Sequence, residues 1–337
     1  MNEIKKWNRP LKVGLVGATG MVGETFINLL EEQGYPIAEF RPFASVNSEG
    51  SKLQLAGTDW IVQILKPGCF AGLDMVFFSS GDDISKEWAP QAAASGAFAI
   101  DNSNAFRMNK ETHLVVPEVN GNLLNAQSRP QVIANPNCST IQLVVPLKPL
   151  SDQFGLTDVT VATYQAVSGA GIPGYEELLN QTQNFQMIDQ DVKTFPKQIL
   201  FNCIPQIGSF GDDGFCTEET KIMDETRKIL NLPDLPVSTF TVRIPALNAH
   251  SEAVWVTLKK EVTKKEFIAA LNTVEGLAVM DDDYPTALDV SGEEPVFVGR
   301  IHRDRFNSKR WLMWVVADNL KKGAALNGIQ IANLIYS

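Results

Sequence analysis

Leu11-Lys12-Val13-Gly14-Leu15-Val16 leads directly into Gly17-Ala18-Thr19-Gly20-Met21-Val22-Gly23. The first six residues are largely apolar and predict a β-strand, and apolar side chains at helical spacing over residues 24–33 predict a helix. Glycines between a strand and a helix let the backbone approach a pyrophosphate, and the helix N-terminus offers free N–H groups to its charge. The spacing G-x-x-G-x-x-G also fits an ordinary tight turn, but the flanking strand and helix favour dinucleotide binding.

Further apolar runs alternate with helical patterns through the first half of the chain. Strands are expected at 37–43, 74–80 and 97–100, and a helix over 84–95. This alternation predicts an α/β fold with a Rossmann-type, doubly wound parallel sheet, whose ligands bind at the carboxyl ends of the strands. Ser45 follows the second strand, where an acid would bind the ribose of NAD, so the sequence leans towards NADP.

A cysteine stands at a second junction of strand and helix. The sequence Asn135-Pro136-Asn137-Cys138-Ser139-Thr140 follows a short apolar run and precedes a segment that can continue as a helix. Free N–H groups and aligned peptide dipoles at a helix N-terminus favour a thiolate, which is the nucleophilic form. A buried structural cysteine is the alternative, but the polar turn is a poor place for one. Cys138 is therefore the candidate for covalent catalysis.

The second half of the chain has a different pattern. Strands are expected at 159–167, 237–244, 252–258, 296–301 and 311–317, with long connections between them, and Pro173-Gly174 is expected to open a helix that runs to about Val192. Such runs predict an α+β domain with a mixed, largely antiparallel sheet and helices on one face, and one face of such a sheet could support a dimer interface. We expect a dinucleotide-binding domain of residues 1–136 plus 319–337, and a substrate-binding and dimerisation domain of residues 137–318. The C-terminal segment has apolar residues at helical spacing, and such a helix often packs back on the first domain.

Composition excludes several classes of protein. The 337 residues carry a net charge of −10, which argues against a nucleic-acid partner but allows a small anionic ligand. We expect no membrane span, because the longest uncharged stretch contains Pro136 and Pro146. The four cysteines form no CxxC pair, which favours a reducing cytoplasm, and three widely spaced histidines suggest no metal site.

Several charged residues are candidates for binding an anionic substrate. Arg107 lies in a polar segment after a predicted strand, and Arg243 lies near the end of another; a solvated loop charge is the alternative for Arg107. Glu218 and Lys221 are three residues apart, so they share one face of a predicted helix that Thr217 could cap. A first-turn acid with a local ion pair is the alternative for these two.

An enzyme built on Cys138 also needs an acid or base. The chain offers only three histidines: His113 near a turn of the first domain, His250 in a predicted loop after a strand, and His302 among arginines that would oppose its protonation. His250 is the best choice of the three, although an isolated loop histidine is more often solvated.

Taken together, these motifs resemble those of aspartate-semialdehyde dehydrogenase, and the match runs from Val13 to the C-terminal helix. In the first half of the chain the matching motifs are the Gly17–Gly23 turn, Asp101-Asn102-Ser103 with Arg107, and Asn135–Thr140. In the second half they are, in order, Tyr164-Gln165-Ala166-Val167-Ser168-Gly169-Ala170-Gly171, Glu218 with Lys221, Arg243-Ile244-Pro245 with His250-Ser251, and Asp318-Asn319-Leu320 before Lys322-Gly323-Ala324-Ala325. Each motif alone is weak evidence, but so many in one order are highly specific.

The resemblance implies a role for each motif. Cys138 would form an acyl thioester, His250 would act as general acid and base, and Gln165 would position the acyl group. Arg243 and Glu218 would hold the amino-acid end of the substrate. Further binding residues would be Arg107 and Lys221 for the phosphate and Asn137 for the substrate. The cofactor would be held by Gly17, Ala18, Thr19, Gly20, Met21, Val22, Gly23, Ser45, Ser168, Gly169 and Asn319.

One segment departs from the family pattern. After the second strand the family usually has Ser-x-Arg-Ser-x-Gly-Lys, whereas this chain has Ser45-Val46-Asn47-Ser48-Glu49-Gly50-Ser51. Two basic residues expected near the 2′-phosphate are missing and an acid is present, although Lys52 could substitute for the lysine by a one-residue shift. The expected cofactor is NADP, with NAD tolerated.

The implied reaction is the NADP-dependent reductive dephosphorylation of 4-phospho-L-aspartate to L-aspartate 4-semialdehyde through a Cys138 thioester. This step serves lysine, threonine, methionine and diaminopimelate biosynthesis, and the family implies a homodimer or homotetramer. Two alternatives stay open. One is a related acyl-phosphate reductase such as N-acetyl-glutamyl-phosphate reductase, which would not need Glu218 for a free ammonium group. The other is a catalytically silent binding relative, which would not need Cys138.

Overall fold

The computed structural model describes residues 7–186 and 192–337. The chain forms two compact units. The first consists of Met1–Pro136 with Ala324–Ser337, and the second of Asn137–Gly323. Within the described residues, no helix combines the length and the apolar character needed to cross a bilayer.

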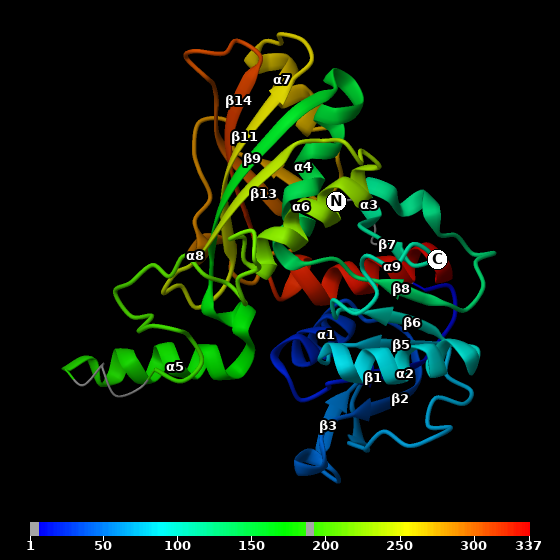
Figure 1. Cartoon of the computed structure of the whole chain (residues 1–337). Helices are drawn as coiled ribbons and strands as arrows, with labels where there is room; N and C mark the ends of the chain where they lie inside the picture. The colour runs from blue at the N-terminus through cyan, green and yellow to red at the C-terminus, as the bar shows by residue number, and fades with distance from the viewer. Residues whose placement is uncertain (1–6, 187–191) are drawn as a thin grey trace. The chain divides into compact units, whose positions relative to one another are not determined.

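The first unit is built on a six-stranded sheet in its described residues, with the order β2-β1-β5-β6-β8-β7 (Figure 1). All of these pairings are parallel, which confirms the predicted doubly wound sheet. The strands are β1 (Leu11–Val16), β2 (Ile37–Phe43), β5 (Met75–Phe78), β6 (Phe98–Asp101), β7 (His113–Leu114) and β8 (Val132–Ala134). A separate antiparallel hairpin joins β3 (Lys52–Leu55) to β4 (Thr58–Ile61).

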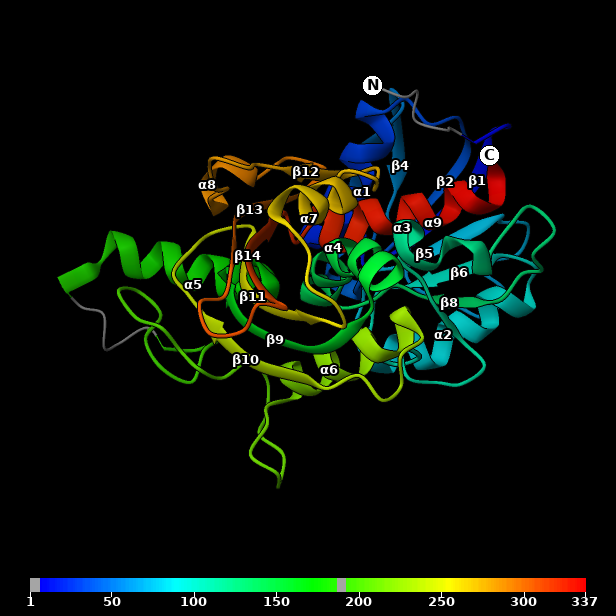
Figure 2. The same ribbon diagram turned by 90° about the horizontal axis from the view of Figure 1, so that it is seen from above.

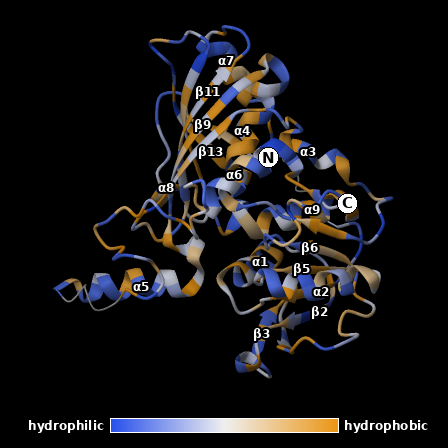
Figure 3. Cartoon of the chain, viewed as in Figure 1, coloured by the Kyte–Doolittle hydropathy of each residue, from blue (hydrophilic) through white to orange (hydrophobic). Residues whose placement is uncertain are grey.

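Helices cover both faces of this sheet. The apolar sides of α1 (Met21–Glu32) and α9 (Leu326–Tyr336) share one buried cluster with alternate residues of β1 and β5. The apolar side of α2 (Asp82–Ala94) belongs to a second cluster with the other residues of the same strands. The ribbon of α2 accordingly carries both hydrophilic and hydrophobic residues in Figure 3. The short helices α3 (Pro117–Asn120), η1 (Val46–Ser48) and η2 (Gly121–Leu123) lie in connections.

The second unit contains the mixed, largely antiparallel sheet that the sequence predicts. Its order in the described residues is β10-β9-β11-β14-β13-β12. Antiparallel pairings join β11 to β9 and β14, and β13 to β14, whereas β10–β9 and β12–β13 are parallel. The strands are β9 (Leu156–Gln165), β10 (Val237–Arg243), β11 (His250–Leu258), β12 (Leu277–Val279), β13 (Val296–Arg303) and β14 (Arg310–Ala317).

The two faces of this second sheet differ. Along β9, β10 and β11 every second residue is buried, because these residues face α4 (Cys138–Phe154) and α6 (Thr217–Leu230). Figure 2 shows α4 beside β9 and β11. Other helical elements among the described residues of this unit are η3 (Val167–Ala170), α5 (Gly171–Gln183), α7 (Lys264–Leu271) and α8 (Ala287–Val290). The π-helical turn Lys321–Ala325 includes the boundary between the two units, after Gly323.

Three local predictions were wrong. The helix after Pro173 was expected to run to about Val192, but α5 ends at Gln183, and residues 187–191 lie outside the described part. The cap of α6 is Cys216 rather than Thr217. His250 is the first residue of β11 rather than a loop residue, because its backbone pairs with Ala317 on β14.

Candidate active site

The N-terminus of α4 presents the candidate nucleophile. Asn137 is the N-cap, and its side-chain oxygen accepts hydrogen bonds from the N–H groups of Ser139 (3.0 Å) and Thr140 (3.2 Å). This cap fixes the first turn of the helix, because it satisfies N–H groups that have no partner within the helix. Cys138 is the first helical residue and is partly exposed.

Two glutamates of α6 hold this turn in place. Glu225, which is fully buried, accepts a 2.7 Å hydrogen bond from the backbone N–H of Asn137, and Glu218 accepts one of 2.8 Å from the Asn137 side chain. No motif in the sequence singled out Glu225. Its spacing of seven residues from Glu218, which places both on one helix face, was the available signal.

Three candidate side chains meet at one edge of the second sheet. Gln165 ends β9 and Arg243 ends β10, and the parallel register pairs these two residues directly. Because β11 runs antiparallel to β9, His250 at its start lies at the same edge. All three side chains are buried on the helix-covered face. The sheet topology therefore brings together residues that lie far apart in the sequence.

Glu218 links these strand ends to the cysteine turn. Its carboxylate accepts hydrogen bonds from Gln165 (3.1 Å) and Asn137, and its other oxygen lies 3.5 Å from Nζ of Lys221. Burial, the largest influence, favours the neutral acid, but Lys221 and the hydrogen-bond donors outweigh it and lower the pKa of Glu218. The site therefore contains a buried carboxylate that can pair with a cationic group of a ligand.

Arg243 supplies the buried positive charge. Its Nη1 donates a 2.6 Å hydrogen bond to the backbone oxygen of Ala166, and the guanidinium lies over the ring of Phe195 at 6.0 Å. Burial lowers the pKa of Arg243, while the charges of Glu218 and Cys138 oppose this effect. Arg243 therefore interacts electrostatically with both the buried carboxylate and the sulfur.

His250 is held by the backbone around it. The N–H of Ala166 donates a 3.0 Å hydrogen bond to Nδ1, and the side chain of Gln142 donates one of 3.2 Å to the His250 carbonyl. Within the described residues, Nε2 has no hydrogen-bond partner. Burial, followed by the charge of Arg243, lowers the pKa of His250 to about 3.

Ser168 and Asn319, both predicted to contact the cofactor, are joined to each other. The Ser168 hydroxyl lies 3.0 Å from Oδ1 of Asn319 and 3.2 Å from Oδ1 of Asn248. Gly169 follows in η3. A Cβ atom added there would lie 2.8 Å from Nη1 of Arg243 and 3.1 Å from Nε2 of His250. Gly169 therefore faces both groups without a side chain between them.

The other predicted residues belong to the first unit. Arg107 is buried there, and its guanidinium donates to the backbone oxygens of Asn135 (3.0 Å) and Asn102 (2.9 Å). The predicted phosphate ligand thus also orders the backbone that leads to Cys138. Among the described residues, no group of three or more His, Cys, Asp or Glu side chains could hold a metal ion.

The glycine turn between β1 and α1 fits a dinucleotide. Gly17 has a φ of +82°, and a Cβ there would lie 2.2 Å from the backbone oxygen of Ser79. A Cβ at Gly23 would lie 2.4 Å from the oxygen of Gly17. Both positions therefore require glycine, as expected where a helix N-terminus packs tightly against a strand and admits a pyrophosphate.

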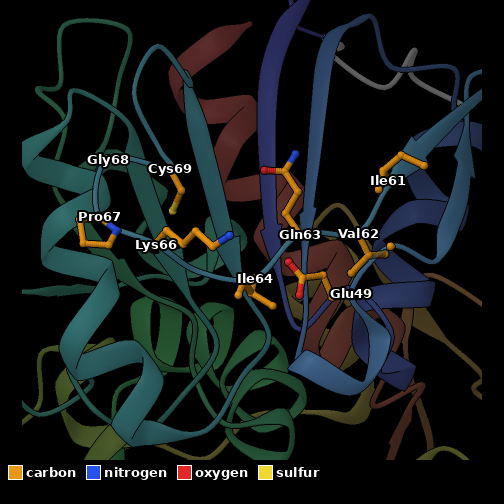
Figure 4. Close-up of a pocket in the computed structure, with 10 residues that line it drawn as sticks. Glu49, Ile61, Val62, Gln63, Ile64, Lys66, Pro67, Gly68 and Cys69 are labelled. Carbon is orange, nitrogen blue, oxygen red and sulfur yellow. The ribbon is translucent and has the colours of Figure 1, made fainter.

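A pocket of about 530 Å³ lies beyond the carboxyl end of β2. Ser45 starts the η1 turn nearby but does not line it. Figure 4 shows the side chains of Glu49 and Lys66 directed towards the same space. Lys52 instead pairs with Asp59 at 3.0 Å. The pocket is lined by Glu49, Gly50, Ile61, Val62, Gln63, Ile64, Lys66, Pro67, Gly68 and Cys69.

Comparison with known proteins identifies both units. Residues 12–127 match the family model "Semialdehyde dehydrogenase, NAD binding domain", and residues 147–322 match "Semialdehyde dehydrogenase, dimerisation domain". The aspartate-semialdehyde dehydrogenase of Aquifex aeolicus is 45% identical over 331 residues, covering 96% of this chain and 97% of the relative. That of Bacillus subtilis is 42% identical over 337 residues, with coverages of 96% and 97%.

Solved structures give the same result. The chain superimposes on aspartate semialdehyde dehydrogenase II of Vibrio cholerae, complexed with ASA, with a TM-score of 0.92 and 39% identity. The match covers 97% of this chain and 98% of that one. The enzyme of Candida albicans with NADP gives a TM-score of 0.76 at 26% identity, with coverages of 96% and 98%.

Proposed function

The chain belongs to the aspartate-semialdehyde dehydrogenase family, and we propose that its reaction proceeds through a thioester on Cys138. The enzyme is an oxidoreductase of the aspartate pathway that reduces 4-phospho-L-aspartate to L-aspartate 4-semialdehyde with a nicotinamide dinucleotide. The observation that supports the thioester is the position of Cys138. It is partly exposed at the first turn of α4, in the same unit as Gln165, Arg243 and His250.

The chemistry needs a thiolate that attacks and is later released. The Cys138 thiolate adds to the acyl carbon, the bond to the phosphate oxygen breaks, and the departing phosphate takes a proton from solvent. A nicotinamide dinucleotide, when bound, would supply the hydride that reduces the thioester carbon. The carbon–sulfur bond of the resulting hemithioacetal then breaks, which releases the aldehyde and restores the thiolate. Hydrogen-bond donors near the acyl oxygen stabilise the negative charge that forms at both additions.

Substrate selection follows from the charged side chains. Glu218 offers a buried carboxylate to the free ammonium group of the substrate, and Arg243 offers a planar guanidinium to its carboxylate. Lys221 and Arg107 are proposed to bind the phosphate, and Asn137 and Gln165 to orient the acyl group. An N-acetylated substrate has no ammonium group, so Glu218 favours aspartate over N-acetyl-glutamate derivatives.

A phosphate-dependent assay tests this function. With aspartate semialdehyde, the protein should reduce the dinucleotide continuously only when phosphate is present, because phosphate must release the thioester; without phosphate, reduction should stop after one equivalent per site. N-acetyl-glutamate semialdehyde should be turned over far more slowly. Equal rates with both aldehydes, or a rate independent of phosphate, would refute the assignment.

For the cofactor we propose NADP with tolerance of NAD. The pocket beyond β2 contains one lysine and one acid, and the carboxyl end of this strand is where dinucleotide enzymes distinguish a 2′-phosphate from a 2′-hydroxyl. Lys66 therefore supplies the positive charge that the two basic residues of the family pattern would otherwise provide near the 2′-phosphate. The negative charge of Glu49 weakens the attraction of this pocket for the 2′-phosphate.

Lys66→Ala is expected to raise the KM for NADP by roughly 10–150-fold, since a hydrogen bond to a charged group contributes about 1.5–3 kcal/mol. The KM for NAD should not change. Lys52→Ala is the matched control, because Lys52 is paired with Asp59. Steady-state kinetics with both cofactors make the comparison, and an equal loss for NADP and NAD would contradict the role of Lys66.

We further propose a homodimer that forms through the open face of the second sheet. The matched family model is a dimerisation domain. On this face Phe240 is 57% exposed, and Tyr164, Trp255 and Trp314 are only half-buried. A sheet face with this much aromatic surface is typical of an interface.

Phe240→Asp is expected to shift the protein towards single chains in analytical ultracentrifugation, since a buried carboxylate at the interface would lack a partner. Leu288→Asp is the control, because Leu288 lies on α8 and is 90% exposed. A wild-type protein with the mass of one chain would rule the dimer out.

We also propose a cytoplasmic location. The four cysteines, at positions 69, 138, 203 and 216, are not joined in disulfides. A reducing compartment keeps the Cys138 thiol available for catalysis.

A further inference from the structure

A buried acid on β11 takes no part in the proposed reaction. Glu252 is fully buried, and neither of its carboxyl oxygens has a hydrogen-bond partner among the residues that the structure describes. Its cross-strand neighbours are Thr163 on β9 and Val315 on β14, and the Thr163 hydroxyl already donates to Gln165 at 2.9 Å. A carboxylate in such a position would be strongly unfavourable, because nothing here replaces the water that it loses.

The side chain of Gln142 on α4 has the complementary deficiency. Its Nε2 donates a 3.2 Å hydrogen bond to the backbone carbonyl of His250. A carbonyl can only accept, so this contact fixes which end of the amide is the nitrogen. Oε1 is then left without a donor within the described part of the chain, although Gln142 is fully buried. Nε2 also carries a second N–H, which the His250 carbonyl does not use.

Glu252 and Gln142 face each other across the contact between β11 and α4 (Figure 2). Burial raises the pKa of Glu252 well above its ordinary value, and the Gln142 amide is the group that opposes this effect in part. A carboxylate could accept the second N–H of Nε2 but would leave Oε1 without a donor. A neutral carboxyl group both donates and accepts, so one proton on Glu252 provides a partner for Oε1 and for both carboxyl oxygens.

The surrounding elements supply no cation that would favour the charged form instead. On β11 the other titratable group of the same face is His250, and burial lowers its pKa to about 3, so its ring is neutral at neutral pH. On α4, Lys148 is paired with Asp152 at 2.7 Å near the surface. On β14, Arg310 stands at the opposite end of the strand from the residues that pair with Glu252.

We propose that Glu252 is a positioning residue that acts as a neutral acid, pairing with Gln142 to fix α4 against β11 one helical turn from the nucleophile. Gln142 follows Cys138 by four residues, so both side chains lie on the same side of the helix. The same amide holds the backbone at the start of β11. The proposal rests on the proposed thioester reaction only in that Cys138 is the group that is positioned.

Infrared spectroscopy tests for the proton itself. The difference spectrum of the wild type minus Glu252→Gln, recorded in heavy water at neutral pH, should contain the C=O band of a protonated carboxyl group. The control Glu275→Gln, at an exposed glutamate, should remove only carboxylate bands. Loss of carboxylate bands alone in Glu252→Gln would overturn the proposal.

Kinetics test the positioning. Glutamine has the shape of a neutral glutamic acid and also both donates and accepts, so Glu252→Gln should retain kcat within about threefold. Methionine has a similar size but cannot pair with the amide. Glu252→Met should therefore lower kcat by about 10–10²-fold, the effect expected when a reacting group is displaced by up to about 1 Å.

The affinity for NADP, measured by fluorescence titration, should be unchanged in both variants. A residue that only stabilised the fold would lower the melting temperature of Glu252→Met without changing the kcat of the folded protein. Equal kcat values in Glu252→Gln and Glu252→Met would therefore overturn the proposal.

The glutamine variant also covers the case in which Glu252→Met does not fold. A folded Glu252→Gln with nearly the wild-type kcat, together with the infrared band, supports the neutral pair. Failure of Glu252→Gln to fold would overturn the proposal, since the amide replaces a neutral acid without a change of shape. Failure of the thioester would show separately, as the absence of an acyl group on Cys138, and would leave the infrared result unchanged.

Discussion

Cys138→Ala is expected to lower phosphate-dependent turnover by at least ~10⁴-fold, because loss of the nucleophile of a covalent mechanism leaves only binding and electrostatic effects. The affinity for the cofactor should not change. The glycine turn proposed to hold the pyrophosphate belongs to the first unit and does not include Cys138. Steady-state assays and titration of NADP binding by fluorescence measure the two quantities.

Cys203→Ala is the control for this variant. Cys203 is an exposed free cysteine outside the elements that carry the site, so its loss should leave turnover unchanged. Substantial turnover by Cys138→Ala would eliminate the thioester step. Weak cofactor binding by that variant would show that the substitution disturbs more than the sulfur.

Arg243→Lys is expected to lower kcat/KM for aspartate semialdehyde by about 10²-fold or more. A guanidinium binds a carboxylate through two parallel hydrogen bonds, and an ammonium group cannot. Lysine would also lack the N–H group that Nη1 donates to the backbone oxygen of Ala166. Glu218 would remain buried nearby with a less well placed positive partner. Leaving a buried charge with a poor partner costs about 3–5 kcal/mol, so the loss should be large.

Comparing the KM for aspartate semialdehyde with the KM for phosphate distinguishes carboxylate binding by Arg243 from a general loss of activity. The KM for the aldehyde should rise far more than the KM for phosphate, because the proposed phosphate ligands are Arg107 and Lys221. Arg310→Lys is the matched control, since Arg310 is a partly exposed arginine of β14 that faces Asp158 at 3.6 Å. A similar rise in both KM values would argue against carboxylate binding by Arg243.

The first unit could be predicted from sequence because its signals are local. Apolar runs of strand length alternate with helical spacings, and right-handed crossovers then give a parallel sheet with few alternatives. Gly17 and Gly23 are required by contacts within one strand–turn–helix segment. The cysteine turn is also local, because Asn137 caps the helix that Cys138 begins.

The rest of the site depends on contacts between distant segments. Glu225 bonds to the backbone 88 residues away, and Ala166 bonds to His250 84 residues away. Every residue except proline has a backbone N–H group, so no sequence pattern points to Ala166 as the partner of His250. His250 was predicted to lie in a loop because the residues next to it in the sequence do not indicate a strand. Its place in β11 depends on pairing with β14, which is distant in the sequence.

The proposed reaction depends on a covalent acyl group on the sulfur of Cys138. The protein is mixed with aspartate semialdehyde and NADP without phosphate, quenched in acid, digested and examined by mass spectrometry. The Cys138 peptide should gain the mass of an aspartyl acyl group, and phosphate added before the quench should remove it. An unmodified Cys138 peptide, or an acyl group on another residue, would contradict the account.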